Sequence, residues 1–306
     1  MQQEIVTNFE NKIHSLLNYE FATKPKAYGY FHLSYLIATI CIAIALIAIF
    51  RKPTKKQVKW IYFAFYIVLF TIELFKQLLG TGQHFKSYVH HQEYIPLMLC
   101  SMPLYIILIY LLVPLKYEKT NNVFLSYLTI FNLWTGLFVM LYPGDVFIKN
   151  IFICHHTMIY HGILLILGLW GTIRTIVKFN FETIMWAGVI FITLMGLIAI
   201  GNEILYQLHK ANKLIDPHTK SEFYPNLFNM SHRRLSPFIS GIAFLKKSPY
   251  WLITLAYIPV TIIFSSLIYA LFSGIGIGIS KLENKIALAI KNKKQANQNQ
   301  ELKQNS

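Results

Sequence analysis

The sequence predicts an all-α, polytopic membrane protein with seven transmembrane helices. Of its 306 residues, 55% are hydrophobic and only 13% are Asp, Glu, Lys or Arg, a balance that is rare in soluble domains. The mean hydropathy is +0.46. The apolar residues cluster in runs of about 20, which match the roughly 30 Å hydrocarbon core of a bilayer. These runs leave little sequence for a separate soluble domain.

The apolar runs predict membrane-spanning helices over residues 31–50, 58–80, 94–115, 122–142, 151–177, 183–208 and 250–273. Breaker residues separate them: Arg51-Lys52-Pro53 follows the first helix, Pro114 ends the third, and Tyr142-Pro143-Gly144-Asp145 follows the fourth. The glycine-rich run 273–278 is predicted to end the last helix. It is not a dinucleotide-binding fingerprint, because no strand precedes it.

The chain is predicted to have three parts. Residues 1–30 carry apolar side chains at helical spacing and predict a helix lying in the membrane interface. Residues 31–273 form the seven-helix transmembrane domain. Residues 274–306 form a basic cytoplasmic tail, which we expect to be disordered beyond a short amphipathic start.

The positive charges indicate the orientation of the chain. The segments predicted inside hold 15 Lys and Arg residues and those predicted outside hold 12, which favours an N-terminus outside and a C-terminus in the cytoplasm. The loop before the last helix carries most of the outer positive charge. The formal net charge of +15 therefore reflects residues that flank a membrane and meet anionic lipids, and nucleic acid is not the expected partner.

Polar side chains gather toward one face of the membrane. All eleven histidines fall on or near the predicted outer side, as do Glu73 and Lys76 of the second helix and Glu203 of the sixth. Each also has a structural interpretation. Glu73 and Lys76 can form an ion pair three residues apart, Glu203 can take part in interhelical hydrogen bonding, and a surface histidine such as His32 can simply be solvated.

Cys100 is the leading candidate for a nucleophile. Pro96 suits the first turn of the third helix and places the thiol about one turn inside, where the helix dipole favours a thiolate. A histidine from the fifth helix could take the proton. Cys100 could instead be a small buried hydrophobic residue, which is our interpretation of Cys41.

The fifth helix opens with Ile153-Cys154-His155-His156-Thr157-Met158-Ile159-Tyr160-His161-Gly162. Cys154 and His161 share a face, whereas His155 and His156 point about 100° apart, so one helix cannot direct all of them inward. A zinc or haem site would need ligands from other helices, and no metal or cofactor is expected. A disulfide between Cys100 and Cys154 is an alternative that would remove the nucleophile.

The loop over residues 209–248 contains Arg233 and Arg234. Guanidinium groups bind phosphate in a bidentate manner, so this pair could hold a lipid headgroup, although interfacial anchoring is an alternative role. Together with His91 and Glu203, these arginines are the candidate substrate-binding residues.

The chain resembles the YwaF-type bacterial integral membrane protein family, which is similar to human transmembrane protein 164. The resemblance is carried by the segment from Tyr94 to Ser101, the histidine-bearing start of the fifth helix, and Ser248-Pro249-Tyr250-Trp251. It implies a phospholipid acyltransferase in which Cys100 matches the nucleophile and His161 the histidine, with His156 as the second choice. The family usually has a histidine two residues before the cysteine, where this chain has Met98.

The leading functional hypothesis is a lipid acyltransferase or acyl-ester hydrolase of the cell membrane, acting on membrane phospholipids. The alternative is a transporter or a membrane protein that binds a solute or metal in an outward-facing polar cavity. A noncatalytic membrane scaffold is the third possibility that the sequence leaves open.

Overall fold

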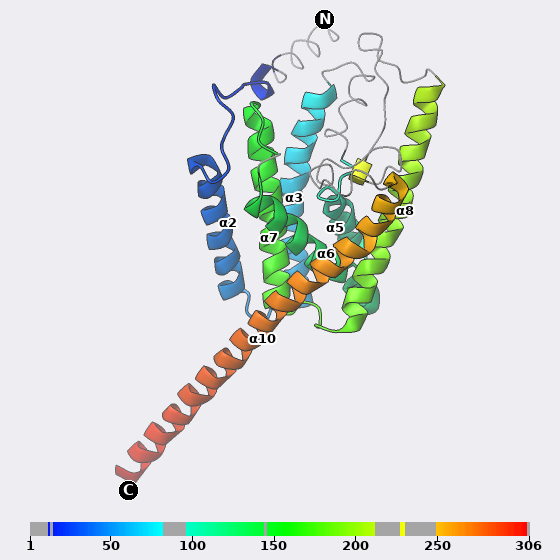
Figure 1. Ribbon diagram of the computed structural model, residues 1–306. Coiled ribbons are helices and arrows are strands. Elements are labelled where there is room, and N and C mark those ends of the chain that lie inside the picture. Colours follow the sequence, from blue (N-terminus) through cyan, green and yellow to red (C-terminus); the bar gives the residue numbers. More distant parts are fainter. Residues whose placement is uncertain are drawn as a thin grey trace, which may run out of the picture.

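The computed structural model describes residues 12, 15–81, 96–143, 146–211, 227–229 and 249–304. This part of the chain contains no β-strand; residues 20 and 150 form an isolated bridge. Its principal elements are the helices α2 (Tyr30–Ile49), α3 (Lys55–Thr81), α5 (Met102–Leu112), α6 (Glu118–Leu141), α7 (Ile151–Ile173), α8 (Phe181–Lys210), the short η1 (Leu227–Asn229) and α10 (Tyr250–Gln304) (Figure 1). The predicted all-α class is therefore confirmed.

Six of the described helices are long and apolar enough to cross a membrane: α2, α3, α6, α7, α8 and α10. Among them, α7 and α6 have 72% and 67% of their most apolar segments buried, against 17–28% for the other four. The two central helices are thus enclosed by protein, and the outer helices turn much of their surface toward lipid. The orientation of the chain stays a prediction.

Close approach of two backbones holds the central helices together. A Cβ atom added to Gly136 would lie 2.4 Å from the Leu165 nitrogen, and one added to Gly168 would lie 2.3 Å from the Leu133 nitrogen. Only glycine fits at such distances, which is the packing that small residues permit between membrane helices. This contact fixes α6 against α7, the helix that carries the candidate histidines.

The third predicted span differs from the prediction. In place of a helix over 94–115, α5 has only 11 residues, about 17 Å at 1.5 Å per residue, which is too short to cross the hydrocarbon core. Pro103 lies in its first turn, where proline fits because it lacks an N–H, whereas Pro96 precedes the helix. The predicted count of seven spans is therefore not confirmed.

The last helix also differs from the prediction. The glycine-rich run does not end it, and α10 continues without a break to Gln304 through the segment expected to be disordered. A Cβ atom added to Gly276 would lie 2.5 Å from the Ile173 carbonyl oxygen, whereas Gly274 and Gly278 have no atom within 4 Å of such a Cβ. The central glycine therefore serves helix packing, and α10 extends beyond the bundle in Figure 1.

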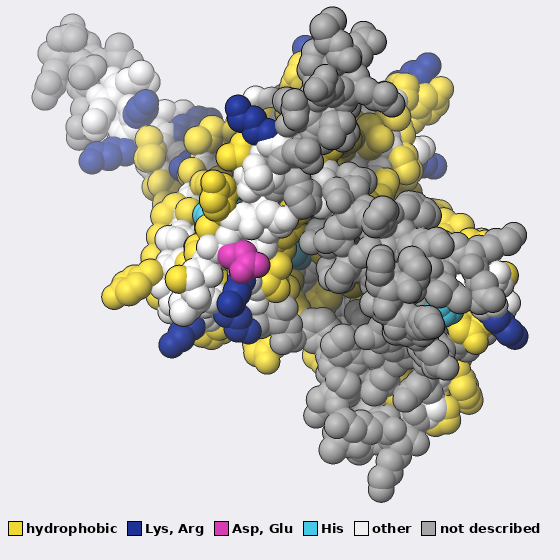
Figure 2. Space-filling view, turned by 90° about the horizontal axis from the view of Figure 1, so that it is seen from above, with side chains coloured by type: hydrophobic (Ala, Val, Ile, Leu, Met, Phe, Trp, Pro, Cys, Tyr) yellow, Lys and Arg dark blue, Asp and Glu magenta, His cyan; other side chains and the backbone are white. Residues whose placement is uncertain are grey.

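The outer surface is apolar, as a lipid-facing surface must be. Large exposed side chains include Ile37 of α2, Phe70 of α3, Leu197 of α8 and Ile263 of α10. Figure 2, which views one end of the bundle, shows hydrophobic side chains around the rim of the described surface. Cys41 lies on this outer surface, so its interpretation as a buried residue is wrong.

His32 is not a solvated surface histidine, contrary to the sequence interpretation. Its side chain is fully buried: Nε2 lies 2.9 Å from the Met140 carbonyl oxygen and Nδ1 accepts a hydrogen bond from the Tyr28 backbone N–H. A carbonyl only accepts, so His32 Nε2 carries the proton. The ring thereby fastens the beginning of α2 to the end of α6.

Candidate functional site

One cavity of about 400 Å³ collects the predicted catalytic residues. It lies at the end of the bundle where α3 ends and α7 begins. Three segments distant in the sequence line it, contributing Glu73, Lys76, Met98, Cys100, Ser101, Val146, Ile148, Ile153, His156, Thr157, Tyr160 and His161. The volume falls in the range of small-molecule sites. Cys100, His156 and His161 thus share one cavity, as a catalytic role would require.

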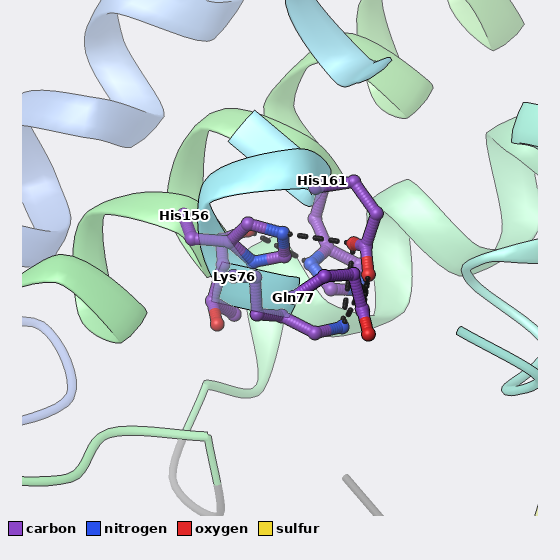
Figure 3. A network of polar contacts seen from close by, with 6 residues as sticks. Lys76, Gln77, His156 and His161 are labelled. Carbon is purple, nitrogen blue, oxygen red and sulfur yellow. Dashed lines mark hydrogen bonds and ion pairs between the residues drawn. The ribbon is translucent and has the colours of Figure 1, made fainter. Parts of the chain in front are cut away.

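The polar wall of the cavity is organised by the buried Glu73 carboxylate. Lys76 Nζ lies 3.0 Å from Glu73 Oε1, Gln77 Nε2 donates to the same oxygen at 2.6 Å, and His156 Nε2 lies 3.1 Å from Oε2. Figure 3 shows the side chains of Lys76, Gln77 and His156 converging. The expected ion pair between Glu73 and Lys76 is present, and it belongs to a larger network joining α3 to α7.

This network fixes the orientation of His156. A carboxylate that is ionised only accepts hydrogen bonds, so His156 Nε2 donates its proton to Glu73. In the neutral ring, Nδ1 then holds the lone pair. Burial of both side chains makes the arrangement costly to disturb, because each charge or polar group depends on its partners.

His161 has the tautomer that a general base needs. Its Nδ1 lies 2.8 Å from the Thr157 carbonyl oxygen, one turn earlier on α7. The carbonyl can only accept, so Nδ1 carries the proton and Nε2 of the neutral ring carries the lone pair. The backbone therefore holds His161 in one orientation without using the nitrogen that would take a proton.

One face of α7 lines the cavity. Ile153, His156, Thr157, Tyr160 and His161 follow the spacing of residues that stack on one side of a helix. His155 points away, toward the Tyr35 hydroxyl of α2. The predicted divergence of the two adjacent histidines is present.

The face predicted to join Cys154 with His161 does not form the site. Cys154 is completely buried, and its thiol donates to the Ile148 carbonyl oxygen at 3.1 Å. Cys154 and Cys100 are both free, so the alternative of a disulfide between them is not present.

Cys100 lies just before α5 rather than one turn inside a helix. The segment is closed by hydrogen bonds from the Ser101 and Met102 backbone N–H groups to the Met98 carbonyl oxygen, at 2.9 and 3.3 Å. In the described part of the chain, the Cys100 thiol makes no direct hydrogen bond to the imidazole of His156 or His161. All three side chains line the cavity, so a bound substrate can contact each of them.

Apolar side chains also line the cavity. Met98, Val146, Ile148 and Ile153 provide a surface suited to a hydrocarbon chain. Met98, which stands where the related family usually has a histidine, therefore faces the candidate site directly. The cavity therefore combines polar and apolar lining groups, as an amphiphilic ligand requires.

Tyr160 was missed as a site residue by the sequence analysis. It lines the cavity, and its buried hydroxyl has no hydrogen-bond partner among the described residues. Its position four residues after His156, on the same helical face, is the signal that could have identified it. An unused buried hydroxyl beside a candidate nucleophile can donate to a ligand oxygen.

Of the predicted substrate-binding residues, only Glu203 lies in the described part of the chain, and it does not line this cavity. Glu203 of α8 is absent from its lining and accepts a hydrogen bond from Gln207 at 2.6 Å on the same helix. Its neighbour Asn202 makes reciprocal hydrogen bonds with the Leu227 backbone at 2.9 and 3.1 Å. His91, Arg233 and Arg234 lie outside the described residues.

No group of three or more His, Cys, Asp or Glu side chains within the described ranges could hold a metal ion. Among the polar groups of the cavity, Lys76 and His156 are instead paired with Glu73.

Comparison with known proteins adds one finding. Residues 27–269 match the model of the TMEM164 family, a stretch that runs from just before α2 into α10 and includes every residue lining the cavity. No curated protein and no solved structure matches the chain.

Proposed function

The chain belongs to the TMEM164 family of membrane proteins, and we propose that it is a phospholipid acyltransferase or acyl-ester hydrolase of the cell membrane. The observation that carries the proposal is the cavity shared by Cys100, His156 and His161. A thiol, an imidazole with a free lone pair and apolar side chains in the lining are the groups needed to bind a lipid acyl ester and attack its carbonyl.

In the proposed first step, the Cys100 thiol gives its proton to His161 Nε2 and the sulfur attacks the ester carbonyl carbon. The ester C–O bond then breaks, a thioester forms on Cys100, and the departing alkoxide takes the proton from His161. In the second step, an acceptor hydroxyl or water gives its proton to His161 and attacks the thioester. The sulfur leaves and recovers the proton, so the protein ends unchanged.

The surrounding residues support these steps. Burial raises the pKa of the Cys100 thiol, and the Lys76 ammonium, which is paired with Glu73, only partly offsets this effect, so the thiol needs a base to take its proton. The Tyr160 hydroxyl is a candidate donor to the oxyanion that develops on the carbonyl. Met98, Ile148 and Ile153 would hold the acyl chain.

The decisive experiment compares Cys100→Ser with Cys154→Ser in the full chain, purified in nanodiscs that contain defined phospholipids. Incubation with an acyl-labelled phospholipid and a lysophospholipid acceptor should give labelled product and a hydroxylamine-sensitive acyl-protein with wild type. Cys100→Ser should abolish the hydroxylamine-sensitive adduct, and Cys154→Ser should retain it because that thiol is fully buried and does not line the cavity. Equal product formation by Cys100→Ser and wild type would refute the cysteine mechanism.

A second candidate function is a transporter or solute-binding protein, and the charged wall of the cavity favours it. Glu73 and Lys76 are buried in a helix of membrane-spanning length, and such groups often line a solute pathway. Flux measurements in proteoliposomes discriminate the two functions. Uptake that is lost in Glu73→Gln but retained in Cys100→Ser would favour transport over acyl transfer.

A further inference from the structure

A second cavity lies at the opposite end of the bundle from the candidate active site. It measures about 420 Å³ and sits where α2 ends, α3 and α6 begin, and α7 ends. The ends of membrane-spanning helices lie at the level of lipid headgroups. The cavity is therefore placed at a bilayer surface and not within the hydrocarbon core.

The lining of this cavity carries an excess of positive charge. Its cationic residues are Arg51, Lys52, Lys55 and Arg174, and its acidic residues are Glu118 and Glu283. Both carboxylates are already paired, Glu118 with Lys55 and Glu283 with Arg174. Lys52 has no ion-pair partner in the described part of the chain. A concave site with this balance attracts an anion.

The back of the cavity is rigid because Arg174 fastens three helices. Its guanidinium is buried, donates from Nε to the Ile47 carbonyl oxygen at 2.7 Å, and binds both Glu283 oxygens at 3.0 and 3.1 Å. Arg51 reaches the same carboxylate at 3.7 Å. These contacts join α2, α7 and α10 around the cavity, so the site is built before any ligand arrives.

Asn121 adds an unused acceptor. The residue lines the cavity and is buried, and its Nδ2 donates to the carbonyl oxygens of Pro114 and Tyr117 at 2.9 and 2.8 Å. These two bonds fix the amide, and its Oδ1 has no partner among the described residues. A buried acceptor without a donor indicates a ligand hydroxyl, ammonium group or water.

We infer that this cavity is a binding site for a phosphate group presented by an anionic phospholipid headgroup. Arg51 and Lys52, both exposed at the mouth, bind the phosphate oxygens, and Asn121 accepts from a headgroup hydroxyl. The composition of α10 indicates a lipid ligand rather than a soluble one. Along and just beyond the cavity this helix carries exposed Leu282 and Ile286 among lysines, a composition suited to an anionic membrane surface.

The test uses the full chain in detergent, with binding of dioctanoyl phosphatidylglycerol followed by native mass spectrometry. The double variant Arg51→Gln/Lys52→Gln removes two cations from the cavity. The matched control, Lys56→Gln/Lys119→Gln, removes two exposed cations from the same helix ends that do not line it. We expect at least about tenfold weaker binding for the cavity variant and less than a twofold change for the control.

Two further probes identify the ligand, and size-exclusion profiles of both variants establish that they are folded. Dioctanoylglycerol, which lacks a phosphate, should bind no better to wild type than to the cavity variant. Competition by inorganic phosphate at the concentration of the lipid would support a phosphate site but reassign it to free phosphate. Equal losses in the cavity variant and the control would overturn the proposal, because general surface attraction would then explain the binding.

Discussion

His156 Nε2 and Glu73 Oε2 lie 3.1 Å apart across the contact of α7 with α3, although 83 positions separate the two residues in the sequence. The same carboxylate binds Lys76 and Gln77. Glu73 is thus the centre of the polar wall of the cavity. Its negative charge compensates the buried ammonium group and also holds the imidazole ring in place.

Glu73→Gln should therefore destabilise the protein. The substitution leaves the Lys76 ammonium buried without its counter-charge, and breaking such a buried pair from one side costs about 3–5 kcal/mol. A large fall in the apparent melting temperature in detergent is expected. Glu182→Gln, which removes an exposed carboxylate from α8, should leave it nearly unchanged.

The double variant Glu73→Gln/Lys76→Met provides the second measurement. Because it removes both charges, it should recover much of the stability lost in Glu73→Gln. A double variant that is less stable than Glu73→Gln would contradict the pairing and give Lys76 a structural role of its own.

The sequence predicted which elements meet at the candidate site, but it could not predict how they are oriented. Helical geometry separates His155 from His156 by about 100°, yet both sides of α7 are covered by other helices. Only the positions of Tyr35 on one side and Glu73 on the other decide which histidine enters the cavity. Which histidine lines the cavity therefore depends on contacts between residues far apart in the sequence, and helical periodicity does not predict those contacts.

The glycine-rich run in α10 shows the same limit. Glycine is both a helix breaker and the residue that allows two helices to touch, so local composition cannot distinguish the two roles. The close approach of Ile173 on α7 shows that Gly276 allows helix packing and does not end the helix. The beginning of α5 was misplaced for a related reason, because Pro96 and Pro103 are both compatible with a first turn.

Gly276→Ala is expected to weaken the docking of α10. An added Cβ would lie 2.5 Å from the Ile173 carbonyl oxygen and force the helices apart. We expect a loss of stability of about 1–3 kcal/mol, the usual cost of overpacking. Thermal unfolding in detergent measures it. Gly274→Ala and Gly278→Ala are the matched controls, since both sites are open and the higher helix propensity of alanine predicts no loss there. A similar loss in all three variants would show that the contact with Ile173 does not explain the effect.

Met98→His should make Cys100 more reactive. Met98 lines the cavity with the thiol, so an imidazole there provides an additional base at the position where the related family usually has histidine. The expected result is alkylation of Cys100 by a neutral maleimide about tenfold faster near neutral pH, which is less than the roughly 10²–10⁴-fold that an optimally positioned base contributes. Met98→Gln, which is polar and similar in length but not basic, should give no such increase. Equal acceleration by both variants would indicate easier access and not base catalysis.

His161→Gln and His156→Gln should separate a catalytic histidine from a positioning one. His161 is oriented by the Thr157 carbonyl oxygen and keeps Nε2 for proton transfer, so His161→Gln should lower the rate of acyl transfer by about 10²–10⁴-fold with little change in stability. His156 donates its Nε2 proton to Glu73, so His156→Gln should lower the stability more than His161→Gln does and the rate by a smaller factor. Single-turnover rates of acyl-protein formation, read beside thermal unfolding, distinguish the two. The opposite ranking would transfer the role of base to His156, whose Nδ1 would then be the proton acceptor.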